Sequence, residues 1–402
     1  MRRIVYWLSL LLIFMIPWEN ALAVGDLGSL NRVAGILVAA AWVSLVLVNG
    51  QFRKPHLFHW GMSLFVLWSA GSIFWSFDRD GTLSRVQTYV QLLGLIFILW
   101  DLYATQEALH AGMQAYVLGA CVSAGSTILN YFTGQEAYVY SGGRYAGAGL
   151  NADDLALILA LALSLAWYLA TSLKNNATGR ILKLVNLAYM PVGLFAILLT
   201  ASRMGVLAVV PVVLFVLVTS QQLPLKARVG AAAAFLLAFF LLLPHIPEPA
   251  IARLSTISSS LEQGDLGGRV DLWRGVLGVF AEHPLIGVGS GAIDAFPDVG
   301  AVAHNTFLSV LAELGLVGFI LFLGVLMVVV HEALGQPTQR SVAWLTVLAV
   351  WTIGVSTLSW EFRKPTWLLM GLLIVSAHLQ NRDDSGAPPE PGYCENPGGP
   401  GV

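Results

Sequence analysis

Residues 303–319 read AHNTFLSVLAELGLVGF, and this stretch decides the fold class. Beyond its first residues the run stays apolar to about residue 330, which is long enough for a helix that crosses a lipid bilayer. Two polar side chains, His304 and Asn305, stand at its head, where a segment that only faces lipid does not need them. The stretch therefore predicts a membrane span with a polar site at one end.

The whole chain has the composition of an integral membrane protein. Its 402 residues are 57% hydrophobic and 11% charged, and the mean hydropathy is +0.74, whereas soluble proteins carry about 25% charged residues. The net charge of −2 gives no indication of nucleic-acid binding. We expect an all-α fold, a polytopic bundle of about 12 membrane-spanning helices.

Apolar runs of spanning length recur along the chain. The N-terminal run has a basic start and an A-x-A-like ending, which imitates a cleavable signal peptide. A retained first helix is favoured, because so many later spans can insert without a cleaved signal. We place the runs at residues 4–22, 32–49, 57–76, 86–104, 109–132, 152–172, 182–200, 204–220, 229–244, 305–330, 341–359 and 365–380.

An even number of spans puts both termini on one side of the membrane. The positive-inside rule favours cytoplasmic termini, although the bias in the total number of basic residues is slight. Four cations run against the rule because they fall in short connections on the outer side. These cations, which are candidates for ligand binding, are Arg144, Arg203, Arg363 and Lys364.

One connection is long enough to be functional. We predict a single membrane domain over residues 1–380, with a large outer loop over 245–303, and a Pro/Gly-rich cytoplasmic tail over 381–402 that we expect to be disordered. Apolar residues from Trp273 to Phe280 fall at helical spacing, and Pro284 ends that pattern. The loop therefore holds an amphipathic helix, which rests on the membrane interface or caps the bundle.

The arginines of the outer side suggest an anion site. Guanidinium groups bind phosphate oxygens in a two-pronged geometry, so Arg203 and Arg269 from separate segments could hold a diphosphate. The alternatives are an arginine that anchors a helix end for Arg203 and a solvated helix start for Arg269. Arg274 lies five residues after Arg269, on another face of the helix, so either of the two could face the ligand.

His304 is the candidate general base, because imidazole accepts a proton at neutral pH. The alternative is an interfacial histidine with ordinary hydrogen-bond partners. Asn305 could hold a hydroxyl group, but a helix cap is the better interpretation. Glu313 falls on the opposite face of an ideal helix, so we expect it to pair with another helix. The acids at 153–154 are most simply interpreted as a helix cap.

Metal and nucleotide chemistry have little support in the sequence. The chain has no short ligand spacing such as H-x-x-x-H, no P-loop and no dinucleotide fingerprint. We therefore expect no metal and no cofactor, and an enzyme of this kind would need a donor that is already activated.

Four stretches together resemble one family. GRVDLWRGVLGVFAEHPLIGVGSGAI (268–293), followed by AHNTFLSVLAELGLVGFILFL (303–323), resembles the signature region of the O-antigen ligase and polymerase family of bacterial membrane glycosyltransferases. LLTASRMGVLAVV (198–210) is similar to the family's Thr-x-Ser-Arg segment. AGLNADDLALILALAL (148–163) and FRKPTWLLMGLL (362–373) are similar to a middle span and the last span.

The resemblance implies a concrete activity. Members of the family move a glycan from an undecaprenyl-diphosphate carrier at the periplasmic face of the inner membrane, without a nucleotide or a required metal. Ligases transfer it to lipid A–core, and polymerases transfer it to a second carrier-linked glycan. The family's histidine falls on His304, and its arginines fall on Arg203 and, less securely, on Arg269. Compact length and one large outer loop favour a ligase slightly.

A transporter or lipid flippase is the alternative from another class. Transporters often carry inverted repeats and polar groups near the middle of the bilayer. No internal repeat is visible here, and the polar residues gather at one face, with Glu313 as the main exception.

Overall fold

The computed structural model describes residues 1–22, 29–50, 52–136, 143–221, 225–256, 269–296 and 299–385. In these ranges the regular structure is helical and no β-strand occurs, so the predicted all-α class is confirmed. The α-helices are α1 Arg2–Met15, α2 Leu30–Asn49, α3 Leu57–Gly71, α4 Arg79–Leu102, α5 Gln106–Phe132, α6 Ala152–Ser172, α7 Ala177–Leu199, α8 Arg203–Ser220, α9 Leu225–Leu242, α10 Glu248–Ser255, α12 Arg269–Glu282, α13 Thr306–Leu334, α14 Thr338–Val355 and α15 Lys364–Ser385.

Every apolar run expected from the sequence coincides with one of these helices. Within the described residues, nine helices are long and apolar enough to cross a membrane, which is fewer than the 12 spans expected. The boundaries differ where local capping decides them: α4 begins at Arg79, before the apolar run, because the Asp78 side chain accepts a hydrogen bond from the Gly81 N–H. α15 continues to Ser385, past the expected start of the tail, and residues 386–402 lie outside the described part.

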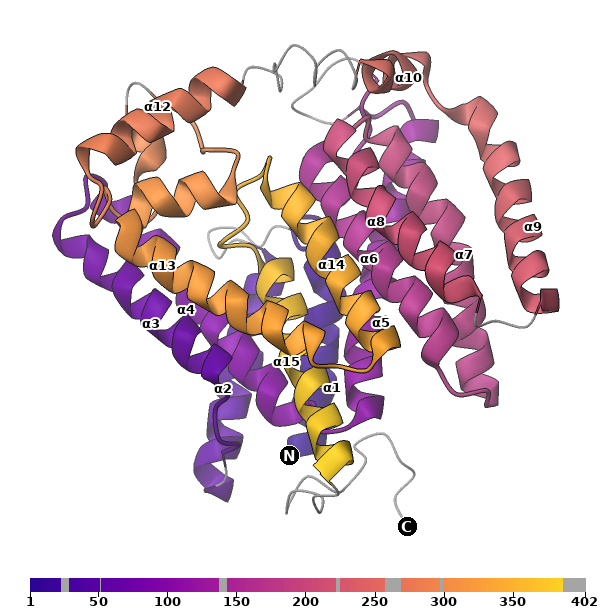
Figure 1. The fold of residues 1–402 in the computed structure, drawn as a ribbon, viewed down its shortest axis with the longest axis horizontal. Helices are drawn as coiled ribbons and strands as arrows, with labels where there is room; N and C mark the ends of the chain where they lie inside the picture. Colours follow the sequence, from indigo (N-terminus) through magenta and orange to yellow (C-terminus); the bar gives the residue numbers. More distant parts are fainter. Residues whose placement is uncertain are drawn as a thin grey trace.

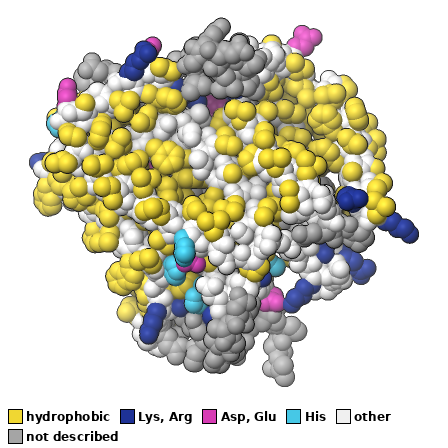
Figure 2. Space-filling model, in the orientation of Figure 1, with side chains coloured by type: hydrophobic (Ala, Val, Ile, Leu, Met, Phe, Trp, Pro, Cys, Tyr) yellow, Lys and Arg dark blue, Asp and Glu magenta, His cyan; other side chains and the backbone are white. Residues whose placement is uncertain are grey.

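The outside of the bundle is apolar where lipid would surround it. Leucine and valine side chains of α2, α8 and α9 are exposed, and Figure 2 shows a broad field of hydrophobic side chains, with most visible charged groups toward the upper and lower margins. This distribution is that of a multi-pass membrane protein.

α6 is the buried axis of the bundle. It packs against α5, α7, α8 and α14, and 89% of its most apolar 18-residue stretch is buried. Its Leu/Ala sequence suits this position, because a helix that is apolar on all sides can be buried on all sides. The start of α6 is therefore a rigid point in the molecule.

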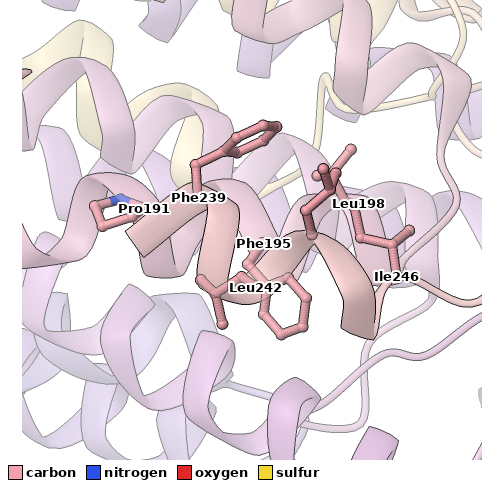
Figure 3. A pocket seen from close by; sticks show the side chains of 7 residues that line it. Pro191, Phe195, Leu198, Phe239, Leu242 and Ile246 are labelled. Carbon is pink, nitrogen blue, oxygen red and sulfur yellow. The ribbon is translucent and has the colours of Figure 1, made fainter. Parts of the chain in front are cut away.

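α9 lies at the periphery and packs on α7 (Figure 1). Between them is a small crevice lined only by apolar residues, among them Pro191, Phe195 and Leu242 (Figure 3). Since it holds no acid, base or hydrogen-bonding side chain, this crevice is not a site of chemistry.

The predicted amphipathic helix is α12, and it caps the bundle. Val276 and Val279 are buried in a small apolar cluster with residues of the following loop and of α13, while Leu277, expected on the same face, is exposed. α10 and α12 lie at one end of the bundle, which we call the loop face, and the start of α1 and the end of α15 lie at the other end (Figure 1).

The tenth predicted span is broken rather than continuous. Gly315 has φ 66° and ψ −169° inside α13, a conformation that is essentially restricted to glycine. Residues 306–314 thus form a separate half-helix next to the loop face. Its last carbonyls are satisfied by the loop, because Val288 and Gly289 donate to Ala312 O and Glu313 O at 3.1 and 2.9 Å.

We expect Gly315→Ala to lower the free energy of unfolding by about 1–3 kcal/mol, the usual cost of such backbone strain. The added Cβ would also overlap the Leu285 backbone. Gly324→Ala in the same helix is the matched control, because a Cβ there meets open space, and it should be neutral or slightly stabilising. Thermal unfolding of both variants in detergent measures the difference, and equal midpoints would contradict the role of Gly315.

Candidate active site

Three of the helices that begin at the loop face are α6, α8 and α13, and each is capped by a side chain. The Asn151 side chain accepts from Asp154 N at the start of α6, and Ser202 Oγ accepts from Gly205 N at the start of α8. Asn305 Oδ1 accepts from the N–H groups of residues 307 and 308 at the start of α13. Helix N-termini carry partial positive charge, so this face favours an anion.

Backbone strain is concentrated at the same three helix starts. Within the described residues, the non-glycine residues with positive φ are Ala148 (58°), Ala201 (49°) and His304 (47°), and each stands shortly before one of these helices. Such conformations cost free energy and persist only where the surroundings impose them. The chain therefore holds the residues around these turns in fixed positions.

Asp153 joins the arginines of this face. Its Oδ1 accepts from Arg144 Nη2 at 2.9 Å and from Ser202 Oγ at 2.6 Å. Its Oδ2 lies 3.9 Å from Arg269 Nη2. Arg144 is almost fully buried and also donates through Nε to Thr200 O at 2.9 Å. Arg144 is thus held firmly, whereas Arg269 is partly exposed and more loosely paired.

Asp154 faces the connection between α14 and α15, residues 356–363. Its Oδ1 accepts from the buried Trp360 indole at 2.6 Å, and its Oδ2 accepts from Arg363 Nη2 at 3.2 Å. The two neighbouring acids therefore bind two different parts of the chain. Our interpretation of Asp153 and Asp154 as the helix cap was wrong, because the Asn151 side chain makes the cap. Both acids still stand in the first turn of α6, where they suit the helix dipole, and Asp154 Oδ2 also accepts from Asn151 Nδ2 at 2.6 Å.

His304 precedes the half-helix and lies within electrostatic range of Arg269, Asp153 and Asp154. Burial lowers the pKa of His304 below its ordinary 6.5, and the Arg269 cation lowers it further, while the two carboxylates act in the opposite direction. At neutral pH the imidazole is therefore uncharged and can accept a proton.

Asn305 performs the capping role that the sequence favoured. Besides its two backbone acceptor contacts, its Nδ2 donates to Ser356 O at 3.0 Å. The next residue, Thr306, donates to Leu358 O and accepts from Trp360 N. These bonds fasten the start of α13 to the α14–α15 connection, which also reaches Asp154.

Three other candidates make their contacts with other parts of the chain. Arg203 donates to Arg253 O at 3.2 Å and to Thr256 Oγ1 at 2.6 Å, both at the end of α10. Arg274 is exposed and pairs with Asp271. Lys364 forms an ion pair with Glu19. Of the two arginines on α12, the geometry thus favours Arg269.

Sequence reasoning missed Asp153, Asp154, Ser202 and Trp360. A usable signal was present in NADD (151–154), because two acids directly before a fully apolar span are more than one cap needs. Within the described residues, no group of three or more His, Cys, Asp or Glu side chains could hold a metal ion.

A family model described as O-Antigen ligase matches residues 187–323. The chain carries a domain of the O-antigen ligase family. The resemblance read from the sequence is therefore confirmed. The matched range includes Arg203, Arg269 and His304, while Arg144 and the acid pair of α6 lie before it. No curated protein matches the chain. The family domain and the apolar helices together indicate a multi-pass membrane protein that acts on lipid-linked glycans in general.

The pKa of His304 should be measurably low and should respond to its neighbours. Arg269→Gln removes a cation that disfavours imidazolium, so the pKa should rise toward 6.5. Asp153→Asn removes an anion that favours imidazolium, so the pKa should fall. NMR titration of labelled histidines, assigned with His304→Gln, checks this. Arg274→Gln is the control and should change nothing, and a wild-type pKa above 6.5 would contradict the electrostatic description.

Proposed function

We propose that this protein is an O-antigen ligase, a glycosyltransferase that moves a glycan from an undecaprenyl-diphosphate carrier to a hydroxyl of lipid A–core. The observation that carries the proposal is a histidine of lowered pKa beside Arg269 and the start of α13, inside the matched family region. In this proposal the loop face is periplasmic, both termini are cytoplasmic, and the membrane is the bacterial inner membrane.

Arg269 is proposed to bind the diphosphate. Its pairing with Asp153 is long at 3.9 Å and its side chain is 23% exposed, so diphosphate oxygens can replace the carboxylate at small cost. A guanidinium is suited to this exchange, because it binds phosphate oxygens through two parallel hydrogen bonds. Arg203 is the proposed second cation, and it would exchange its contacts at the end of α10 for the donor.

His304 is proposed to be the general base. Its neutral imidazole takes the proton of the acceptor hydroxyl while the oxygen attacks the anomeric carbon of the donor sugar. The bond from that carbon to the diphosphate oxygen breaks, and the carrier diphosphate leaves with the bonding electrons. Direct displacement inverts the anomeric configuration. The positive helix starts and Arg269 stabilise the leaving anion, so the proposal requires no metal and no nucleotide.

The remaining candidates have supporting roles in this proposal. Arg144 holds Asp153, and Asn305 orients the start of α13. Arg363 and Lys364 stand on the other side of Asp154, where they could contact the acceptor. Arg274 is exposed and bound to Asp271, so it is the matched control rather than a ligand.

A polymerase of the same family is the alternative, because ligase and polymerase share the chemistry and differ in the acceptor. Purified protein with carrier-linked glycan should therefore be offered either lipid A–core or a second carrier-linked glycan, with a chelator present and no nucleotide. Transfer to lipid A–core supports the ligase, and extension of the carrier-linked glycan alone would make the protein a polymerase. Transfer to neither acceptor would refute the enzymatic proposal.

In this assay His304→Ala should lose transfer by about 100-fold or more, the usual contribution of a general base. Donor binding should change little, because the imidazole acts on the acceptor hydroxyl. The wild-type rate should persist below pH 6.5, since the pKa of His304 is lowered. Full transfer by His304→Ala would refute the assignment of His304 as the general base.

Arg269→Ala should raise the KM for the donor and lower kcat/KM by about 10-fold to 100-fold, the range for hydrogen bonds to a charged group. Arg269→Lys should recover only part of this, because lysine lacks the second parallel donor. Arg274→Ala removes the same charge five residues away and should leave kcat/KM unchanged. Equal losses for Arg269→Ala and Arg274→Ala would indicate a general charge effect instead of a binding site.

A further inference from the structure

A buried charge cluster lies behind the half-helix 306–314, and the proposed chemistry does not use it. Arg85 of α4 places Nη1 3.0 Å from Glu361 Oε1 and 3.6 Å from Glu313 Oε2. Both glutamates are almost fully buried. The sequence predicted that Glu313 would pair with another helix, and Arg85 confirms this. Ionisable groups at this depth are costly to bury and require a compensating arrangement.

The contacts of Ser309 support one assignment of the proton in this cluster. Ser309 Oγ lies 2.9 Å from Glu361 Oε1 and 3.4 Å from Glu313 Oε1. A serine hydroxyl has one proton to donate, and the shorter contact assigns it to Glu361. The second contact then joins two oxygens that both carry lone pairs. A proton on Glu313, donated to Ser309 Oγ, would make this contact favourable.

The charge balance leads to the same assignment. Two carboxylates facing one guanidinium in a buried site would leave an uncompensated negative charge, which is strongly unfavourable. Glu361 has the shorter contact with Arg85, which favours Glu361 as the partner that carries the charge. Among the described residues, the other groups that act on Glu313 add no cation. The Gly291 N–H donates to its Oε2 at 2.7 Å, Tyr89 of α4 lies beside the cluster, and Asp294 adds further negative potential.

This cluster joins the segments that hold His304. Ser309 and Glu313 belong to the half-helix that His304 precedes, and Gly291 belongs to the loop that follows α12. Glu361 follows Trp360, whose indole binds Asp154 and whose N–H binds Thr306. The Trp367 indole also donates to Glu361 O at 2.6 Å. The position of the base therefore depends on Arg85, Glu361 and Glu313 together.

We propose that Glu313 is a positioning residue that works as a protonated acid, and that it fixes the half-helix carrying His304 together with the Arg85–Glu361 ion pair. The assignment of a base to His304 rests on the proposed function, while the location of the proton does not.

Infrared spectroscopy of the full-length protein in detergent tests the proton directly. At neutral pH the wild type should show the C=O stretch of a buried carboxylic acid, shifted in heavy water, and Glu313→Gln should lose this band. Glu107→Gln is the matched control, because Glu107 is an exposed glutamate paired with Lys174, and the band should remain. Its absence from the wild type, or its survival in Glu313→Gln, would overturn the proposal whatever reaction the protein performs.

The transfer assay tests positioning. Glu313→Gln should keep kcat within about 3-fold of wild type, because an amide replaces a neutral acid and can still donate to Ser309. Glu313→Ala, Glu361→Gln and Arg85→Gln should each lower kcat by about 100-fold, the scale for a displaced catalytic group. The KM for the donor should stay unchanged, since Arg269 is held by a different acid. If the Glu361→Gln variant were active and the Glu313→Gln variant inactive, the proton would belong to Glu361, and the assignment would be refuted.

Discussion

Two carboxylates at the start of α6 hold the loop face together. α6 is surrounded by four other helices, so its first turn cannot shift without moving the bundle. Asp153 binds Arg144 and Ser202 and, at longer range, Arg269. Asp154 binds Trp360 and Arg363. Segments from α8, α12 and the α14–α15 connection are thus held against the start of α6. His304 experiences the charges of that point directly.

These ion pairs fix the geometry of the site more than they stabilise the fold. Burying a charge pair costs desolvation that its attraction only roughly offsets. What the pairs provide is a fixed geometry, in which Arg144 is firmly bound and Arg269 is loosely bound. This difference suits the diphosphate that we propose as the ligand, because a ligand that replaces the weak contact of Arg269 leaves the contacts of Arg144 intact.

The broken helix α13 gives His304 its place. Gly315 ends the half-helix early, the loop after α12 satisfies its free carbonyls, and Asn305 caps its other end. If α13 were continuous, the axis of the whole membrane helix would fix the position of His304. The half-helix is instead fastened separately, through Glu313 and Ser309 on one side and the α14–α15 connection on the other.

Composition and apolar periodicity by themselves determined the all-α class, the position of each long helix and the amphipathic helix of the loop, because burial in lipid constrains every residue of a span. The motifs also singled out His304, Arg203 and Arg269 and identified the family. The sequence could not show that the acids of 153–154 bind Arg144 and Arg363, that Arg269 rather than Arg274 pairs with Asp153, or that α13 breaks at Gly315. Those features depend on which helix starts meet at the loop face, and only the tertiary packing decides that, because the residues concerned are separated by as many as 209 positions and share no local pattern.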